Sequence, residues 1–123
     1  MLRLHGFWQS GNTFKVAFAL RAMDLPYETV HVDFMNGRTR DPAWRAETNV
    51  MGEAPVLDDG PLRLTQSGVI LTHLARSSGR FGGPDEAEQR EILRWILFDN
   101  HKFTSYFATL RFFAGIQKTA TRP

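Results

Sequence analysis

The sequence predicts an α/β domain with a mixed sheet, followed by the start of an all-helical domain. Three observations support this fold class. A strand pattern, a helix pattern and a second strand pattern follow one another over residues 2–33, and a hairpin pattern at 55–64 precedes another helix pattern. Three glycines and a proline within residues 79–84 then separate these elements from a long helical stretch.

The first two strands and the helix between them form a β-α-β unit. Residues 2–7 are a short apolar run, and residues 12–23 carry apolar side chains at helical spacing. Residues 24–26, Asp-Leu-Pro, end that helix, and residues 27–33 alternate with the period of a strand. Because a crossover helix brings the chain back to the end of the sheet where it started, we expect the two strands to be parallel.

A second helix, a hairpin and a third helix complete the domain. The predicted elements are a short helix at 41–48, strands at 55–57 and 62–64 around the turn Asp58-Asp59-Gly60-Pro61, and a helix at 67–77. The order β-α-β-α-β-β-α is that of a thioredoxin-like domain, which we assign to residues 1–79.

Residues 80–84 are the predicted linker, and residues 85–123 the predicted helical domain. Pro84 and the acids that follow it suit a helix N-terminus. No helix breaker occurs from Asp85 to about Phe113, so we expect a helix there that is roughly 40 Å long. Large apolar groups occupy every face of this helix, and such a helix is normally buried on all sides.

Composition excludes several classes of function. The 15 Lys and Arg residues are scattered among 13 Asp and Glu residues, so we expect no nucleic-acid partner. The apolar runs are too short for a membrane span, and no signal-peptide pattern opens the chain, so we expect a cytoplasmic protein. The chain has no cysteine, and its four histidines are widely spaced, so we expect no metal site, and any thiol chemistry needs a thiol from another molecule.

Three motifs occur in an order that identifies a family. The segments SGNTFKV after the first strand, NVMGEAPVLDDG before the hairpin and LTQSGVILTHLA in the third helix resemble the N-terminal domain of glutathione transferases, most closely the bacterial type with a serine near the first helix. The segment EILRWILFDNHKF resembles the first helix of that family's helical C-terminal domain. The resemblance covers nearly the whole chain.

The resemblance implies a partner, a place and an assembly. It implies glutathione as co-substrate, a small electrophile as second substrate, and a cytoplasmic homodimer with a role in detoxification. In relatives the long helix packs against further helices and lines the dimer interface. We therefore expect the chain to be a truncated or cleaved form that self-associates.

Ser10 is the predicted thiol-activating residue. A thiol with a pKa of about 8.5 needs roughly 2.7 kcal/mol of differential stabilisation to become mostly thiolate at neutral pH. One hydrogen bond to the charged sulfur supplies roughly 1.5–3 kcal/mol, and a helix N-terminus adds roughly 0.3–1 kcal/mol. Asn12 and Thr13 are rivals for the role, and Ser10 or Asn12 could instead simply cap the helix.

The other two motifs supply the predicted glutathione contacts. Ala54-Pro55 resembles the family's cis-proline turn, in which Ala54 offers its main chain to the cysteinyl backbone of glutathione; an ordinary trans proline is the alternative. Gln66 and Ser67 precede the third helix and suit the γ-glutamyl carboxylate, with Ser67 as a plain N-cap the alternative. The family usually has an acid at the position of Gln66.

Arginines before the second helix are candidates for the glycyl carboxylate. Arg38 and Arg40 both lie there, and Arg40 is the residue we assign, with a solvated arginine as the alternative. Glu53 departs from the family, since many relatives have lysine or arginine at that position.

Together these features predict a glutathione transferase in which Ser10 stabilises the thiolate that attacks an electrophilic carbon. A glutathione-dependent disulfide reductase is the alternative enzyme, and a glutathione-binding or dimerising module without turnover is the alternative of another class. The isomerase branch with a Ser-Ser-Cys motif is disfavoured because the chain lacks cysteine.

Overall fold

The computed structural model describes residues 1–118, which form two compact units with the boundary between Phe81 and Gly82. The first unit holds the sheet with three α-helices, and the second is helical. The division between them falls inside the glycine-rich segment at residues 79–84. None of the helices described in residues 1–118 is long and apolar enough to cross a membrane.

The sheet of the first unit has four strands in the order β2-β1-β3-β4. The strands are β1 (Leu2–Gly6), β2 (Tyr27–His31), β3 (Val56–Asp59) and β4 (Leu62–Thr65). Strands β1 and β2 are parallel, as predicted, while β3 is antiparallel to both β1 and β4. The thioredoxin-like order of elements predicted from the sequence is therefore confirmed.

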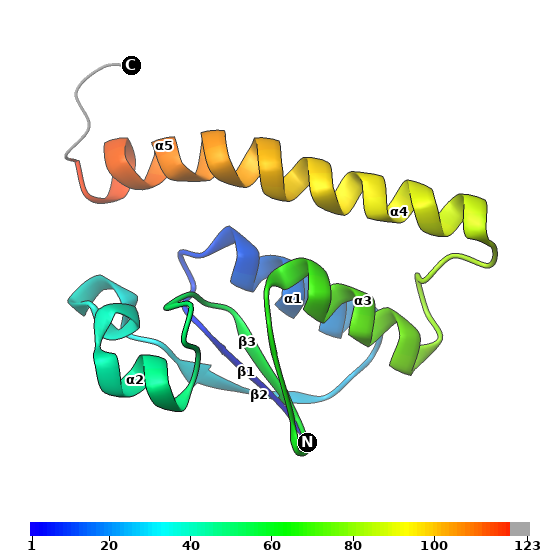
Figure 1. Cartoon of the computed structure of the whole chain (residues 1–123), viewed down its shortest axis with the longest axis horizontal. Helices are drawn as coiled ribbons and strands as arrows, with labels where there is room; N and C mark the ends of the chain where they lie inside the picture. Colours follow the sequence, from blue (N-terminus) through cyan, green and yellow to red (C-terminus); the bar gives the residue numbers. More distant parts are fainter. Residues whose placement is uncertain (119–123) are drawn as a thin grey trace. The chain divides into compact units, whose positions relative to one another are not determined.

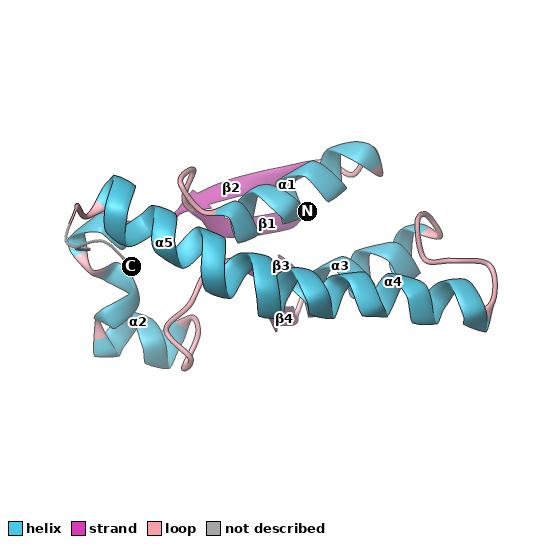
Figure 2. Cartoon of the chain, turned by 90° about the horizontal axis from the view of Figure 1, so that it is seen from above, coloured by secondary structure: helices cyan, strands magenta, loops and turns pink. Residues whose placement is uncertain are grey.

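Helices α1 (Gly11–Ala22) and α3 (Ser67–Ser78) lie side by side over one face of the sheet (Figures 1 and 2). Helix α1 contacts β1, and α3 contacts β3 and β4. The residues buried between these layers form one apolar cluster: Leu4, Val16, Leu20, Met23, Leu57, Ile70 and Leu74. In α3 the cluster takes Ile70 and Leu74, and in α1 it takes Val16 and Leu20, whereas Phe14 and Phe18 of α1 are exposed and lie outside it.

Gly6, at the end of β1, allows α1 to approach the sheet closely. A Cβ atom at this position would clash with the side chain of Thr13 in the first turn of α1. The Thr13 hydroxyl is buried without a hydrogen-bond partner in the described structure. The Thr13 side chain thus packs against the end of β1, and its role as a rival of Ser10 stays a prediction.

The opposite face of the sheet carries a polar network. His5 of β1 lies 2.8 Å from a carboxylate oxygen of Asp58 on β3, and Arg63 of β4 binds both oxygens of the same carboxylate at 2.6 and 2.9 Å. Arg63 also donates to the carbonyl of Glu47, the last residue of α2 (Pro42–Glu47). The hydrogen bond from Arg63, supported by His5, lowers the pKa of Asp58 to about 2 against its partial burial.

The turn of the hairpin is shorter than predicted. Asp58 and Asp59 belong to β3, and the chain reverses at Gly60-Pro61, where Gly60 has a φ of 59°. Two short 3-10 helices, η1 (Phe34–Asn36) and η2 (Arg38–Arg40), fill the connection between β2 and α2. Helix α2 itself begins with Asp41 as its N-cap and Pro42 in its first turn.

The second unit is one continuous helical stretch whose winding changes along its length. It consists of α4 (Glu86–Phe98), the π-helix η3 (Asp99–Ala108), the short α5 (Thr109–Arg111) and the π-helix η4 (Phe112–Ile116). The helix predicted from Asp85 to about Phe113 is present without a break, but beyond Phe98 most of it has π winding and not α winding. Residues 119–123, which fall in the predicted helical domain, lie outside the described residues.

The π winding brings together one pair of aromatic rings, Phe98 and Phe103, that an α-helix would separate. Phe98 and Phe103 are five residues apart, yet their ring centroids lie 5.4 Å from each other. Trp95 contacts Phe98 at 5.6 Å, and Phe103 contacts Phe107 at 5.3 Å. Because a π-helix places residues i and i+5 near one another, the contact between Phe98 and Phe103 joins the other two pairs into one row of rings. We call it the aromatic row (Trp95, Phe98, Phe103 and Phe107).

Candidate functional site

The sheet register brings four chain segments to one end of the first unit. Gly6, the last residue of β1, pairs with His31, the last residue of β2. Val56, the first residue of β3, pairs with the neighbouring His5 and with Thr65, the last residue of β4. The residues that follow β1, β2 and β4, and those that precede β3, therefore meet at the same end of the sheet.

All the site residues predicted from the sequence belong to these four segments. Ser10 and Asn12 follow β1, Arg40 follows β2, Ala54 and Pro55 precede β3, and Gln66 and Ser67 follow β4. Figure 1 shows the N-terminal ends of α1 and α3 at this same end of the sheet. The predicted site residues are spread over 58 residues of the sequence, from Ser10 to Ser67, and in the fold their segments lie at the same end of the sheet.

Ser10 is the N-cap of α1. Its hydroxyl oxygen accepts a hydrogen bond of 3.1 Å from the backbone N–H of Thr13, so the capping alternative weighed for Ser10 is realised. A serine hydroxyl has one O–H donor and two acceptor lone pairs, and capping uses one lone pair. The donor of Ser10 thus stays available, at the positive end of the helix dipole, for an anionic acceptor. Asn12 lies in the first turn of the same helix.

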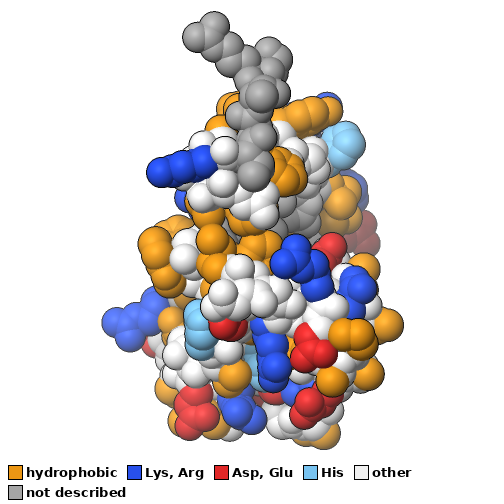
Figure 3. Space-filling view, turned by 90° about the vertical axis from the view of Figure 1, so that its left-hand side faces the viewer, with side chains coloured by type: hydrophobic (Ala, Val, Ile, Leu, Met, Phe, Trp, Pro, Cys, Tyr) orange, Lys and Arg blue, Asp and Glu red, His pale blue; other side chains and the backbone are white. Residues whose placement is uncertain are grey.

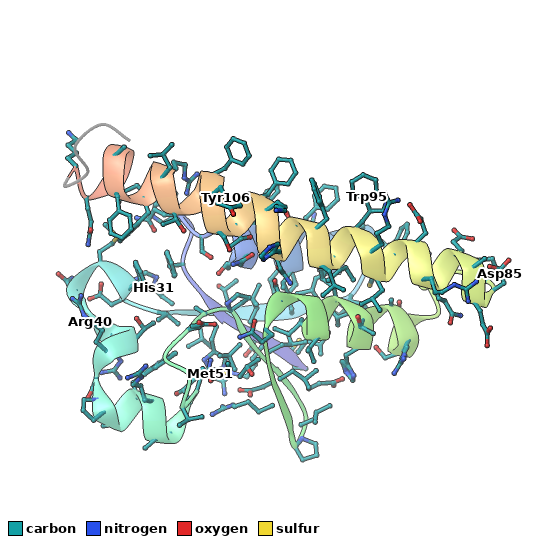
Figure 4. The ribbon with its side chains drawn as sticks, turned by 45° about the horizontal axis from the view of Figure 1, so that its top comes forward. His31, Arg40, Met51, Asp85, Trp95 and Tyr106 are labelled. Carbon is teal, nitrogen blue, oxygen red and sulfur yellow. The ribbon has the colours of Figure 1, made fainter. Side chains whose placement is uncertain are left out.

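The segment before β3 is held by Asn49 and Arg45. Asn49 is 5% exposed; its side chain donates to the carbonyl of Glu53 at 2.8 Å and accepts from the N–H of Met51 at 3.1 Å. Arg45 of α2 donates to the carbonyl of Met51, and its guanidinium occupies the space that a Cβ on Gly52 would need. Figure 4 places Met51 in the loop that follows α2. The sequence analysis missed both residues, although Asn-x-x-Gly is a turn signal.

The Ala54–Pro55 peptide bond is cis. Pro55 is buried, and Ala54 is half-buried. The ladders of β3 with β1 and with β4 begin only at Val56, so the main chain of Ala54 lies outside the hydrogen-bond pattern of the sheet. An extended ligand backbone can pair there as an added strand does.

Gln66, and not Ser67, occupies the N-cap position of α3. Its backbone has a φ of 71°, which a side-chain-bearing residue rarely adopts, and it makes no side-chain capping bond. Ser67 is the first helical residue and is 6% exposed, so the interpretation of Ser67 as a plain N-cap is wrong. The first amides of this 12-residue helix therefore lack a side-chain acceptor from the described residues, which favours binding of an anion.

The side chain of Gln66 reaches the segment before β3. Its amide nitrogen lies 3.0 Å from a carboxylate oxygen of Glu53 and 3.7 Å from the sulfur of Met51. Within residues 1–118, Glu53 has no Lys, Arg or His at ion-pair distance. A carboxylate without a cation thus lies beside the N-terminus of α3.

The two candidate arginines differ in their surroundings. Arg38 lies 3.4 Å from the carboxylate of Asp41, whereas Arg40 has no ion-pair partner within residues 1–118 and is exposed. Figure 4 shows Arg40 on the segment that precedes α2. On the face drawn in Figure 3, Lys and Arg side chains lie among Asp and Glu side chains. Arg40 is thus the better placed of the two for an external carboxylate.

Two of the three histidines of the first unit, His5 and His73, each pair with one acid. His5 contacts Asp58, and His73 lies 2.8 Å from the carboxylate of Asp59. Over residues 1–118 no group of three or more His, Asp or Glu side chains is placed to hold a metal ion.

Comparisons with known proteins point to one family. The family model described as glutathione S-transferase, N-terminal domain, matches residues 1–76. Glutathione S-transferase F14 of Arabidopsis thaliana is 30% identical over 113 residues, which are 89% of this chain and 44% of that protein. Maleylacetoacetate isomerase of Rhizobium meliloti is 30% identical over 117 residues, 91% of this chain and 54% of that protein.

Solved structures agree with the sequence comparisons. A possible glutathione S-transferase from Rhodopseudomonas palustris superposes with a TM-score of 0.85 at 33% identity, covering 95% of this chain and 57% of that one. A glutathione transferase family member from Pseudomonas fluorescens Pf-5, solved with two glutathione bound, gives a TM-score of 0.83 at 26% identity, covering 97% and 55%. The chain spans about half the length of these proteins.

Proposed function

Since the chain belongs to the glutathione S-transferase family, we propose that it binds glutathione at the end of the sheet where Ser10, Ala54 and Ser67 meet, and activates the glutathione thiol. The observation that carries this proposal is the gathering of all the predicted contact residues at one end of one sheet. The reaction we propose is glutathione transfer, in which the thiolate attacks an electrophilic carbon and displaces a leaving group or adds to a double bond.

Ser10 is the proposed thiol-activating residue, of the serine type found in bacterial members. Its oxygen accepts from Thr13 while its O–H donates to the sulfur, so the capping role and the catalytic role use different parts of one hydroxyl. The thiol proton leaves to solvent as the thiolate forms. A donor that binds the thiolate more strongly than the thiol lowers the pKa of the thiol.

The rest of glutathione fits the groups around Ser10. The main chain of Ala54 pairs with the cysteinyl backbone, and the first amides of α3 with the Ser67 hydroxyl take the γ-glutamyl carboxylate. Arg40 takes the glycyl carboxylate, because its guanidinium is exposed and free of an ion pair within residues 1–118.

Isothermal titration with glutathione tests binding, and two assays test the reaction. Turnover of an aryl halide supports the transferase, whereas reduction of a mixed disulfide without turnover of the aryl halide supports a glutathione-dependent disulfide reductase instead. Binding without either reaction would leave a glutathione-binding module. Absence of binding at millimolar glutathione would contradict the proposal as a whole.

Ultraviolet titration of bound thiolate separates Ser10 from Asn12. We expect Ser10→Ala to raise the pKa of the bound thiol while the dissociation constant changes little. Asn12→Ala is the matched variant in the same helical turn. Loss of activity in Asn12→Ala but not in Ser10→Ala would reverse the assignment and favour the disulfide reductase.

We also propose a homodimer as the working assembly. The exposed apolar side chains of the second unit, which include the aromatic row, are more than an isolated soluble helix normally carries. Light scattering over a concentration series tests this assembly. A monomer at all concentrations that binds no hydrophobic dye would contradict it.

A further inference from the structure

Glu53 and Gln66 together form a pair of acceptors beside the N-terminus of α3. Glu53 lies directly before the cis Ala54–Pro55 peptide, and its carboxylate oxygen accepts from the Gln66 amide nitrogen at 3.0 Å. An ionised carboxylate has no donor, so the nitrogen of the Gln66 amide must face Glu53. The amide oxygen of Gln66 is then directed away from Glu53 and can accept a bond from elsewhere.

The position of this pair is held by the backbone. The carbonyl of Glu53 is bound by the buried side chain of Asn49, which sets the course of the main chain from which the carboxylate projects. Gln66 adopts a left-handed φ of 71°. Backbone conformations of this kind persist where the surrounding structure enforces them, and they cluster at ligand sites.

The charge of Glu53 is not balanced within the described chain. Its carboxylate is exposed, its hydrogen bond comes from a neutral amide, and no cation of residues 1–118 is within 4.0 Å of it. The nearby Arg45 donates instead to the carbonyl of Met51. The remaining carboxylate lone pairs and the Gln66 oxygen thus suit a donor-rich cation such as an ammonium group, which has three N–H donors and no acceptor.

We propose that Glu53 binds the α-ammonium group of the γ-glutamyl residue of glutathione, with Gln66 as the neutral half of the receptor. This inference rests on the proposed function, because it specifies how the proposed glutathione site reads one end of its ligand. The α-carboxylate goes to the first amides of α3 and the ammonium to Glu53, so the two charges of the amino-acid head group meet opposite charges. The carboxylate that recognises the ammonium thus comes from the segment before β3 and not from the residue that precedes α3.

The test compares two ligands that differ only in this ammonium. Glutathione and its des-amino analogue, glutaryl-cysteinyl-glycine, are titrated calorimetrically into the wild type and into Glu53→Gln. We expect Glu53→Gln to weaken glutathione binding about tenfold, as for loss of one charge-assisted contact, and to change binding of the analogue less than about twofold. Thermal unfolding of each variant confirms that the fold is retained.

A double variant and a control sharpen the result. Glu53→Gln combined with Gln66→Glu moves the carboxylate to the other end of the same hydrogen-bonded pair, so we expect it to recover glutathione affinity to within about threefold of the wild type. Glu28→Gln makes the same chemical change at an exposed acid on β2 that lies 3.9 Å from Arg3, and we expect no effect on either ligand.

Each of the other outcomes would contradict the inference about Glu53, and one of them would also contradict the proposed function. If Glu53→Gln weakened the binding of both ligands equally, Glu53 would shape the loop and would not bind the ammonium group. Unchanged or tighter glutathione binding in Glu53→Gln would also overturn the inference, the latter because Glu53 would then oppose a ligand carboxylate. A wild type that binds neither ligand would overturn the proposed function together with this inference, whereas a wild type that binds both with equal affinity would overturn the inference alone.

Discussion

The two units of the chain use their apolar side chains in opposite ways. Every buried hydrophobic residue of the described chain lies in Met1–Phe81, where a sheet and two helices enclose the cluster around Leu20 and Ile70. In the second unit no residue up to 118 is buried, and the aromatic row stays more than two-fifths exposed, from 41% at Phe98 to 65% at Phe107.

This difference separates two sources of stability. The first unit draws on burial, which removes apolar surface from water, and on the network around Asp58. The second unit has hydrogen bonds along its helix and ring contacts along the aromatic row, which are local interactions of small energy. Substitutions of the same kind should therefore have large effects in the first unit and small effects in the second.

The largest effect is expected in the core of the first unit. Leu20 is 0% exposed between α1 and its neighbours, so Leu20→Ala removes buried methylene groups and leaves a cavity, at a cost of about 2–5 kcal/mol in the free energy of unfolding. Chemical denaturation followed by fluorescence measures it. The chain has three tryptophans, and Trp44, which is 6% exposed, reports on the first unit once Trp8 and Trp95 are replaced by Phe.

Leu93→Ala is the matched control in the second unit, since Leu93 is 53% exposed. We expect it to leave the Trp44 transition within about 0.5 kcal/mol of the parent protein. Equal losses in the free energy of unfolding from Leu20→Ala and Leu93→Ala would contradict this difference between the units. They would mean that the exposed leucine is buried by a partner and coupled to the first unit.

The second effect concerns the charge of Asp58. Its pKa is about 2, against a usual 3.8, so the folded state binds its proton less readily than the unfolded state does. The stabilisation is therefore present above about pH 4 and is lost as the pH falls toward 2; its size is about 2 kcal/mol. We expect Asp58→Asn to lower the free energy of unfolding by that amount at pH 6.

The pH dependence identifies the cause. As the pH falls from 4 toward 2, the gap in stability between the wild type and Asp58→Asn should close, because the wild-type carboxylate becomes protonated as well. A gap that stays constant over this range would assign the loss to altered packing of the amide and not to the carboxylate charge.

The sequence predicts the features of the fold and the site that depend on patterns over many residues, and it does not predict those that depend on a single residue. The strands, their parallel start and the three helices of the first unit follow from periodicity, and the meeting of Ser10, Ala54 and Ser67 at one sheet end follows from the topology. These features depend on patterns repeated over many residues, so single ambiguities do not change them.

Features that depend on one dihedral angle or one cross-chain contact were not predictable. The sequence Gln66-Ser67 suggests a serine cap, but the left-handed φ of Gln66 makes Ser67 the first helical residue. The contact between Glu53 and Gln66 joins residues 13 positions apart through two loops, and no periodicity reports on that. The π winding after Phe98 also escapes a search based on a period of 3.6 residues.

The third effect compares two helix caps of similar chemistry. Ser10 caps α1 through the N–H of Thr13 at 3.1 Å, and Asp85 caps α4 through the N–H of Glu88 at 2.8 Å. Since α1 is part of the core, we expect Ser10→Ala to cost about 1 kcal/mol in the Trp44 transition. Asp85→Ala should lower helicity measured by circular dichroism and leave that transition unchanged. A shift of the transition by Asp85→Ala would show that the two units unfold together.

The smallest effect is expected at the end of the aromatic row. Phe107 is 65% exposed, and the ring contact described for it is the one with Phe103 at 5.3 Å, so replacing it removes little buried surface. We expect Phe107→Ser to change the free energy of unfolding by less than about 0.5 kcal/mol at low micromolar concentration. The wild type and Phe107→Ser should then be compared at higher protein concentrations. A second copy that covers the aromatic row stabilises the wild type by mass action, and it stabilises the variant less. A difference that grows with protein concentration would support the proposed dimer, whereas a large difference that is independent of concentration would mean that the row is already covered within one chain.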